Sequence, residues 1–402
     1  MTTATMNKSD LMAPPVVQTV ETRSVFVGLV GTVASVAAAF LNPQNFYSAY
    51  LINFMDLLGL SLGCLAILML YHLVGGKWGT VIRRILEAGS MTLPLMAVLF
   101  VPILFMMPHM YLWAAHGHVA ENAQLAHIEA SYLNPTGFKI RFVIYFAIWI
   151  LMAFFLSRWS SEQDTVEGGQ KSTLRFRALS APGIVIYAFS ISFAVIDWVM
   201  SLQAHWISTI YGLIFIAGQA LAGFCLVVVV ESILGKRKPM SEYLTPTEVH
   251  DHGKFMLTFV MVWAYFSFSQ WLIIWAGNLP EEISWFLNRM RGGWGAVGVF
   301  LALFHFAVPF GFLLSRQFKR QTGTLVWIAA LLLVARWVDI WWHIEPAPSF
   351  GHSTIHLSWI HFAVFAGMGG LWLAYFCRNL RARPLLTVYA PQTLKHLEPS
   401  HE

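Results

Sequence analysis

Charged side chains and cysteines are both scarce in this chain. Only 11% of its 402 residues are Asp, Glu, Lys or Arg, whereas 57% are hydrophobic. A soluble domain of this size cannot bury that much apolar surface, so the composition excludes a water-soluble globular protein and indicates repeated membrane crossing. Cys64, Cys225 and Cys377 are far apart and form no CxxC or CxxCH motif. This excludes a disulfide framework, an iron–sulfur site and covalently attached haem.

Apolar runs long enough to cross about 30 Å of hydrocarbon are frequent. The ten runs are residues 25–41, 46–73, 91–107, 139–156, 181–203, 208–232, 255–277, 293–315, 323–341 and 357–377. We therefore predict an all-α polytopic membrane protein with ten transmembrane helices.

The cations are distributed very unevenly between the predicted connections. Alternate connections, together with the two ends of the chain, hold 20 of the 25 Lys and Arg residues. Because cytoplasmic loops are enriched in Lys and Arg, both termini are predicted to be cytoplasmic, and the first 24 residues are expected to be a tail. The net charge of +5 is thus explained by topology, and nucleic acid is not an expected partner.

A weak internal repeat runs in the same direction through both halves. Gly63 matches Gly223 at a spacing of 160 residues, and Trp198 matches Trp337 at 139, the shortfall being explained by a longer, flexible linker at 157–180. The repeat predicts two parallel four-helix bundles, helices 2–5 and 6–9, flanked by helices 1 and 10. The predicted parts are a cytoplasmic tail (1–24), a flanking helix (25–45), the first bundle (46–203), the second bundle (204–341), an outer loop with helix 10 (342–377) and a second cytoplasmic tail (378–402).

Four ionisable residues lie deep in predicted spans, where charges are costly and usually mark function. Asp56 lies in the second span, Asp197 in the fifth, and Arg336 and Asp339 are one helical turn apart in the ninth. Arg336 and Asp339 are expected to form a local ion pair. A lone carboxylate such as Asp56 has to be neutral, paired or wet, and a neutral one can exchange protons. The alternative is that Asp56 only stabilises helix packing.

Polar residues from several spans fall at a similar depth, which predicts a polar cavity that opens toward the outer face. These are Asp56, Arg141, Asp197, Gln270, Arg336, Asp339 and His361. Tyr187, Ser190 and Ser201 share a stripe with Asp197, so their hydroxyls either conduct protons or bond back to their own helix. His109, His116 and His118 in the long outer loop indicate a metal site only by their number, and we expect no bound metal.

Four stretches of sequence resemble the NrfD/PsrC-like membrane subunits, and more closely the ActF-type subunit of bacterial alternative complex III. They are Gly63-Cys64-Leu65-Ala66 with His72-Leu73-Val74-Gly75-Gly76-Lys77-Trp78-Gly79, Ile196-Asp197-Trp198-Val199-Met200-Ser201-Leu202 with His205-Trp206, Phe268-Ser269-Gln270-Trp271, and Gly277-Asn278-Leu279-Pro280-Glu281-Glu282. Gln203 and Ala204 stand where relatives often have an acid and a proline, which weakens a proton role for that short loop.

The resemblance implies a subunit of a quinol-oxidising complex in a bacterial cytoplasmic (inner) membrane. Its expected partners are a second NrfD-like membrane subunit, an outer-face iron–sulfur subunit and c-type cytochrome subunits. Haem and iron–sulfur clusters are expected only in those partners, and the substrate is expected to be menaquinone or another quinone.

Together these observations predict a proton relay and a quinone cavity. The relay residues are Asp56 and Asp197 as carriers, His305 as a mid-membrane link, Arg336 with Asp339 as the pair that sets their charge state, and His72 with Glu231 as an inner half-path. The cavity candidates are Trp198, His205, Gln270, Trp337 and His361. A secondary transporter and a purely structural anchor for redox subunits are the alternatives, and the parallel repeat argues against the transporter.

Overall fold

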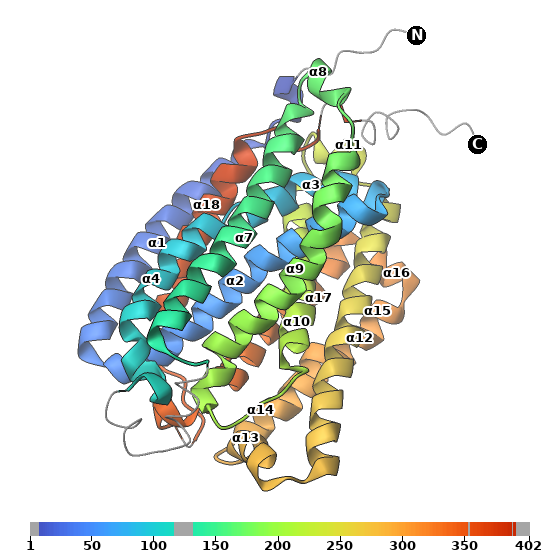
Figure 1. Cartoon of the computed structure of the whole chain (residues 1–402). Helices are drawn as coiled ribbons and strands as arrows, with labels where there is room; N and C mark the ends of the chain where they lie inside the picture. The colour runs from blue at the N-terminus through green and yellow to red at the C-terminus, as the bar shows by residue number, and fades with distance from the viewer. Residues whose placement is uncertain (1–7, 116–131, 353, 388, 391–402) are drawn as a thin grey trace.

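The structure is a bundle of long helices (Figure 1), and the computed structural model describes residues 8–115, 132–352, 354–387 and 389–390. All regular elements in these ranges are helices, which confirms the predicted all-α class. Ten spans within them are long and apolar enough to cross a membrane, as predicted. They are Pro15–Leu41, Pro43–Val74, Lys77–Met110, Pro135–Glu162, Leu174–Gln203, Tyr211–Leu234, Pro246–Gly277, Trp294–Leu314, Thr322–Ile344 and Trp359–Arg381.

Seven of these spans are single α-helices and three are interrupted. The single helices are α1 (Pro15–Leu41), α2 (Pro43–Val74), α7 (Pro135–Glu162), α10 (Tyr211–Leu234), α12 (Pro246–Gly277), α17 (Thr322–Ile344) and α18 (Trp359–Arg381). The interrupted spans are α3 (Lys77–Ser90) with α4 (Leu93–Met110), α9 (Leu174–Trp198) with η3 (Met200–Gln203), and α14 (Trp294–Leu301) with η4 (Ala302–Ala307) and α15 (Val308–Leu314). The short helices are η1 (Lys8–Leu11), η2 (Leu112–Ala114), α8 (Val166–Gly169), α11 (Met240–Tyr243), α13 (Pro280–Met290), α16 (Arg316–Lys319) and η5 (Pro348–Phe350).

Several helices begin well before the apolar run that predicted them, and proline explains where they start. Pro15, Pro43, Pro135 and Pro246 are the first residues of their helices. Proline suits this position because its missing N–H would be unpaired there and its φ is already helical. The predicted tail of residues 1–24 is correspondingly shorter, since α1 includes its last ten residues, and residues 1–7 lie outside the described ranges.

The predicted flexible linker at 157–180 is mostly helical. The helix α7 continues to Glu162, α8 follows, and α9 begins at Leu174. Ion pairs tie the connection together, because Glu162 accepts from Lys171 at 3.1 Å and from Arg175 at 2.7 Å. The charged residues of this segment, which led us to predict a flexible linker, instead form ion pairs between the end of α7 and the start of α9.

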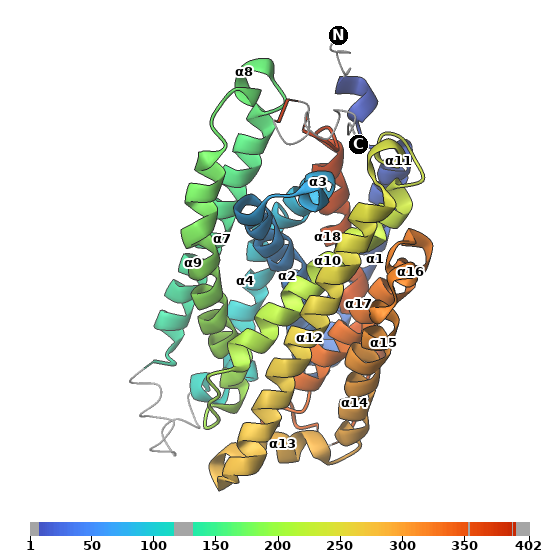
Figure 2. The same cartoon turned by 90° about the vertical axis from the view of Figure 1, so that its right-hand side faces the viewer.

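Two helices, α2 and α10, occupy the centre of the molecule (Figure 2) and pack directly against each other. A Cβ atom on Gly63 would lie 2.0 Å from the carbonyl oxygen of Gln219, and one on Gly223 would lie 2.9 Å from the backbone of Gly63. Only glycine therefore permits this helix crossing. Around this centre, α2 also packs against α4 and α9, with α7 beside both, while α10 packs against α12 and α17.

The first and last spans form a separate pair, α1 with α18, which lie side by side in both views (Figures 1 and 2). A Cβ atom on Gly31 would lie 2.2 Å from the backbone nitrogen of Gly367. Small residues allow such close approach between helices in a membrane. The backbone N–H of Leu385 donates to the carbonyl of Leu11 at 2.8 Å, so the start of α1 and the end of α18 lie on one side of the molecule.

Candidate functional site

A buried ion pair lies on the face of α17 that points into the molecule. The Arg336 guanidinium donates to Oδ2 of Asp339 at 2.5 Å, which confirms the predicted local pair. One turn further on, Nδ1 of His343 lies 2.8 Å from the Asp339 carbonyl oxygen and 3.3 Å from its carboxylate. Gly218 of α10 leaves room for the guanidinium, because a Cβ atom there would lie 2.3 Å from it. Arg336, Asp339 and His343 thus form one polar row.

Two aromatic rings extend this row toward the neighbouring helices. The indole N–H of Trp263, on α12, donates to Oδ2 of Asp339 at 3.2 Å. The ring of His305 lies against that indole, with 3.9 Å between the ring centroids. His305 belongs to η4, a π-helical segment in the eighth span, and neither ring nitrogen has a hydrogen-bond partner among the described residues. Single π-helical segments in α-helices occur frequently at functional sites.

A cavity of about 710 Å³ opens beside this row. Its walls come from α10, α12, α13, α14, η4 and α17 and are mainly aromatic and aliphatic. Its polar groups are few: Gln270 and Ser267 on α12, Arg289 on α13, and Asp339 and His343 on α17. An apolar cavity of this size with a few polar groups at one wall is typical of small-molecule sites, which measure about 300–1,000 Å³.

Arg289 closes one end of the cavity in a fixed orientation. Its guanidinium lies over the Trp285 ring, 3.6 Å from the centroid. It donates to the carbonyl oxygens of Trp342 at 3.1 Å and His343 at 2.5 Å. The side chain is therefore held by stacking and by backbone acceptors, although no carboxylate pairs with it among the described residues. A guanidinium held in this way can donate a hydrogen bond to an electron-rich oxygen of a ligand in the cavity.

Asp56 lies on α2 and is 9% exposed. Its carboxylate makes no hydrogen bond or ion pair with another residue in the part of the chain that the structure describes, and Arg336 is the charge that acts on it. The predicted role of Asp56 as a proton carrier stays a prediction.

Asp197 has a different environment, because both of its carboxylate oxygens are occupied. Arg141 donates from Nε to Oδ2 at 2.8 Å and from a terminal nitrogen to Oδ1 at 2.9 Å. The Tyr145 hydroxyl also donates to Oδ2, at 2.9 Å. The hydroxyls of Ser190 and Ser201 bond back to carbonyls of their own segment. At these two serines the structure therefore supports hydrogen bonding back to the serine's own helix, which was the alternative to proton conduction.

The residues of the predicted inner half-path lie on separate helices. His72 stacks on Phe176, with 4.6 Å between ring centroids. Glu231 instead pairs with His252 at 3.0 Å, and the other ring nitrogen of His252 lies 2.9 Å from the Trp78 carbonyl oxygen. No hydrogen bond or ion pair joins His72 to Glu231 among the described residues, so their shared path stays a prediction.

Of the five predicted quinone-cavity candidates, only Gln270 lines the large cavity, and Asp339 lines it among the other residues of the predicted polar cavity. Trp198 is buried among aromatic rings of the first half, and His205 is exposed. Trp337 and His361 are joined through Asn53, which accepts from the Trp337 indole at 2.8 Å and donates to the His361 carbonyl at 2.9 Å. His116 and His118 lie outside the described residues.

Sequence reasoning missed His343, Trp263 and Arg289. One signal was present for His343, because it follows Asp339 by four residues and so shares its helix face. Trp263 belongs to α12 and Arg289 to α13, and no sequence spacing connects either residue to Asp339.

The ten membrane-length helices and the buried polar row define a multi-pass integral membrane protein. A scan against protein-family models and a search of curated proteins find no match for this chain. The particular function therefore has to be argued from the site.

Proposed function

We propose that the protein is a membrane subunit of a quinol-oxidising electron-transfer complex, and that the cavity beside α17 holds the quinone ring. The observation that carries this proposal is a cavity of about 710 Å³, lined mainly by apolar side chains, with Asp339 and His343 at one wall. A quinone has the same character, since it is a flat apolar ring with polar oxygens at two positions. Gln270 and Arg289 add polar groups at other points of the wall.

Quinol oxidation releases two protons with two electrons, so the site needs a proton acceptor near the ring. Nδ1 of His343 faces two oxygens of Asp339, one at 2.8 Å and one at 3.3 Å. This arrangement favours the tautomer with the proton on Nδ1, which leaves Nε2 free to accept a proton. The nearby carboxylate stabilises the imidazolium that would form. His343 is thus the proposed first acceptor.

A proton taken up by His343 has candidate onward carriers in the same row. Asp339 is fixed by Arg336 and by the Trp263 indole, and Arg336 also acts on Asp56. We propose that the charge of Arg336 couples the protonation of Asp339 and Asp56. Electrons would leave to redox groups of partner subunits on the outer face.

We also propose that the two halves are parallel repeats with a shared central interface. The matched glycines Gly63 and Gly223 meet where α2 and α10 cross. Contacts within α2, α4, α7 and α9 and within α10, α12, α14, α15 and α17 support two bundles, which α1 and α18 flank. The excess of cations on one side supports a cytoplasmic location for both ends of the chain in a bacterial inner membrane.

The proposal is tested on the complex purified from native membranes through a C-terminal tag. His343→Gln should reduce quinol turnover by at least ten-fold, because a positioned general base contributes about 10²–10⁴-fold. His109→Gln is the matched control, since His109 is an exposed histidine at the end of α4, outside the cavity. Photolabelling with an azidoquinone should mark residues of α12 or α17 in the parent protein.

Two outcomes would contradict the proposal. Full turnover in His343→Gln, together with no photolabel on α12 or α17 in the parent protein, would remove the cavity from quinol chemistry and favour a structural anchor. A chain that purifies without redox subunits in mild detergent, and that exchanges a solute across liposomes, would instead be a secondary transporter.

A further inference from the structure

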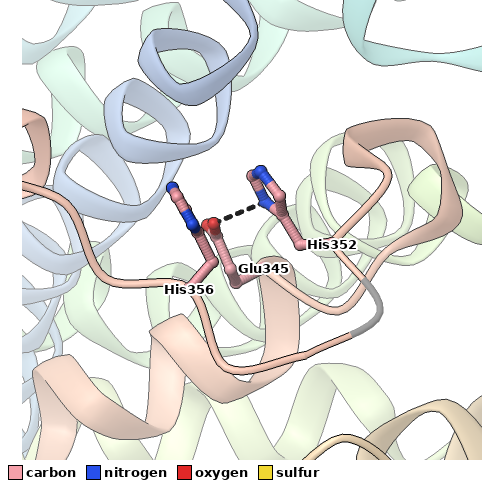
Figure 3. Close-up of side chains that lie close together, drawn as sticks. All are labelled: Glu345, His352 and His356. Atoms are coloured by element: carbon pink, nitrogen blue, oxygen red, sulfur yellow. Dashed lines mark ion pairs between the residues drawn. The ribbon is translucent and has the colours of Figure 1, made fainter.

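The connection between α17 and α18 carries a second cluster of ionisable side chains, separate from the cavity. Glu345 immediately follows α17, and His352 and His356 lie in the same connection (Figure 3). Each of the three residues offers one atom that can bind a metal ion, and these three atoms lie within 4.8 Å of one another. Figure 3 shows the Glu345 carboxylate close to both imidazoles and marks its ion pair with His352. The two imidazole rings stack on each other, with 4.2 Å between their centroids.

The hydrogen bonding of His352 determines which of its ring nitrogens carries the proton. Nε2 lies 3.1 Å from the side-chain oxygen of Asn45, on α2, and an oxygen can only accept, so Nε2 carries a proton and donates it. In a neutral imidazole, Nδ1 then holds a lone pair. Nδ1 lies 2.8 Å from Oε1 of Glu345, without the alignment of a hydrogen bond. Two lone pairs this close repel unless a cation neutralises them, and that cation is either a second proton on His352 or a metal ion.

The ligand atom that His356 offers is also without a hydrogen-bond partner. Nε2 of His356 is buried and has no hydrogen-bond partner in the described residues. Glu345 is fully buried, and its second carboxylate oxygen lies 3.3 Å from Nε2 of His361. A buried carboxylate requires a partner of this kind.

We propose that Glu345, His352 and His356 bind a Zn²⁺ ion, although the sequence led us to expect no metal. Two imidazoles and one carboxylate are a known zinc ligand set, with bonds of about 2.0–2.2 Å and a fourth position for water. Tetrahedral ligands at that distance lie roughly 3.4 Å apart. Nδ1 of His352 and Oε1 of Glu345, which are 2.8 Å apart, would therefore separate slightly, and the wider spacings, all within 4.8 Å, would close toward the same value. Asn45 and His361 would orient the ligands from outside, as hydrogen-bonded neighbours do in metal sites.

Such an ion would join the end of α17, the connection that follows it, and α2 through Asn45. Pro348 and the left-handed Gly351 fix the backbone between Glu345 and His352. The zinc site therefore stabilises the entry into α18. This proposal does not depend on quinol chemistry, because no ligand of the ion lines the large cavity.

The test uses the full chain, purified with a tag that contains no histidine. After chelation and exchange into metal-free buffer, one equivalent of Zn²⁺ should bind per chain and remain bound through gel filtration, as measured by elemental analysis. Co²⁺ in its place should give the visible absorption bands of a low-symmetry site. His352→Gln and His356→Gln should each weaken binding at least ten-fold, whereas His109→Gln should not.

Asn45→Ala gives a second measurement that leaves every ligand in place. It should weaken Zn²⁺ binding while the protein still elutes as a folded species. Binding of less than about one tenth of an equivalent to the parent chain would overturn the proposal. Uptake that is equal in the parent and in the two ligand variants would show adventitious binding and would overturn it as well.

Discussion

Replacing Asp197 by asparagine tests whether this carboxylate is a structural partner or an exchangeable proton carrier. The substitution keeps the shape of the side chain but removes the charge that Arg141 contacts at 2.8 Å and 2.9 Å. Removing one partner of a buried ion pair costs about 3–5 kcal/mol. The Arg141 side chain is 19% exposed, so water compensates part of its charge. We therefore expect a loss near the lower end of that range, about 3 kcal/mol.

The measurement is thermal unfolding in detergent, followed by intrinsic tryptophan fluorescence. Tyr145→Phe removes only one hydrogen bond to the same carboxylate and should cost about 1 kcal/mol. Asp56→Asn is the matched carboxylate control and should change stability by less than about 1 kcal/mol, because Asp56 has no hydrogen bond among the described residues. The expected order of melting temperatures is therefore Asp56→Asn highest, then Tyr145→Phe, then Asp197→Asn.

A different order would refute the reasoning. An Asp197→Asn protein as stable as the parent would mean that the pair with Arg141 contributes nothing net. Asp56→Asn as the most destabilising change would mean that the Asp56 carboxylate has a partner that its geometry does not reveal.

Three further predictions concern packing and charge elsewhere. Gly31→Ala should destabilise the protein by about 1–3 kcal/mol in thermal unfolding, because its Cβ atom would clash with the α18 backbone; Gly369→Ala, which meets only a ring carbon at 4.0 Å, should not. Glu231→Leu should lower the melting temperature more than Glu231→Gln, because only glutamine still offers His252 an oxygen; equal losses would contradict this. Burial raises the pKa of Tyr132 to about 12, so the unfolded chain loses this proton first and stability should fall between about pH 10 and about pH 12; unfolding measured across that range should be less pH-dependent in Tyr132→Phe, and an identical slope would contradict the assignment.

The ten spans could be predicted from sequence because a run of about twenty apolar residues is a strong signal. The local pair between Arg336 and Asp339 could also be predicted, because a spacing of three residues on one helix fixes their proximity. The starts of α1 and α12 were missed because polar and charged residues follow within their first three turns, such as Glu21 and Arg23 in α1 and Glu248 and Asp251 in α12, although Pro15 and Pro246 mark these starts.

A cavity was predicted with Gln270 and Asp339 among its residues, but its mainly apolar lining could not be predicted. Its walls come from helices that are apolar on all sides, so composition does not tell which face of α12 or α14 meets a neighbour. The same limit applies to the pair between Arg141 and Asp197, which are 56 residues apart and meet only through packing of α7 against α9. Glu345 was missed for another reason: it lies one residue past the end of α17, outside the apolar run.

The two halves of the protein use their buried charges differently. In the first half, both carboxylate oxygens of Asp197 accept hydrogen bonds from Arg141, so neither oxygen is without a partner. In the second half, Arg336 retains unpartnered nitrogens and both nitrogens of His305 are unpartnered among the described residues. Buried polar atoms without partners are costly unless a ligand or water completes them. Arg336 pairs with Asp339, and His305 lies against Trp263; Asp339 and Trp263 both line the cavity.

This contrast can be tested by replacing each pair as a whole, since apolar replacement of a complete buried pair is often neutral or stabilising. We expect Arg141→Leu/Asp197→Leu to recover most of the stability that Asp197→Asn loses and to retain quinol turnover. Arg336→Leu/Asp339→Leu should be folded but should lose turnover, because it removes the carboxylate that orients His343. Turnover measured on purified complexes of equal melting temperature decides the question. Loss of activity in the first double variant alone would make Asp197 the proton carrier and the cavity a packing feature.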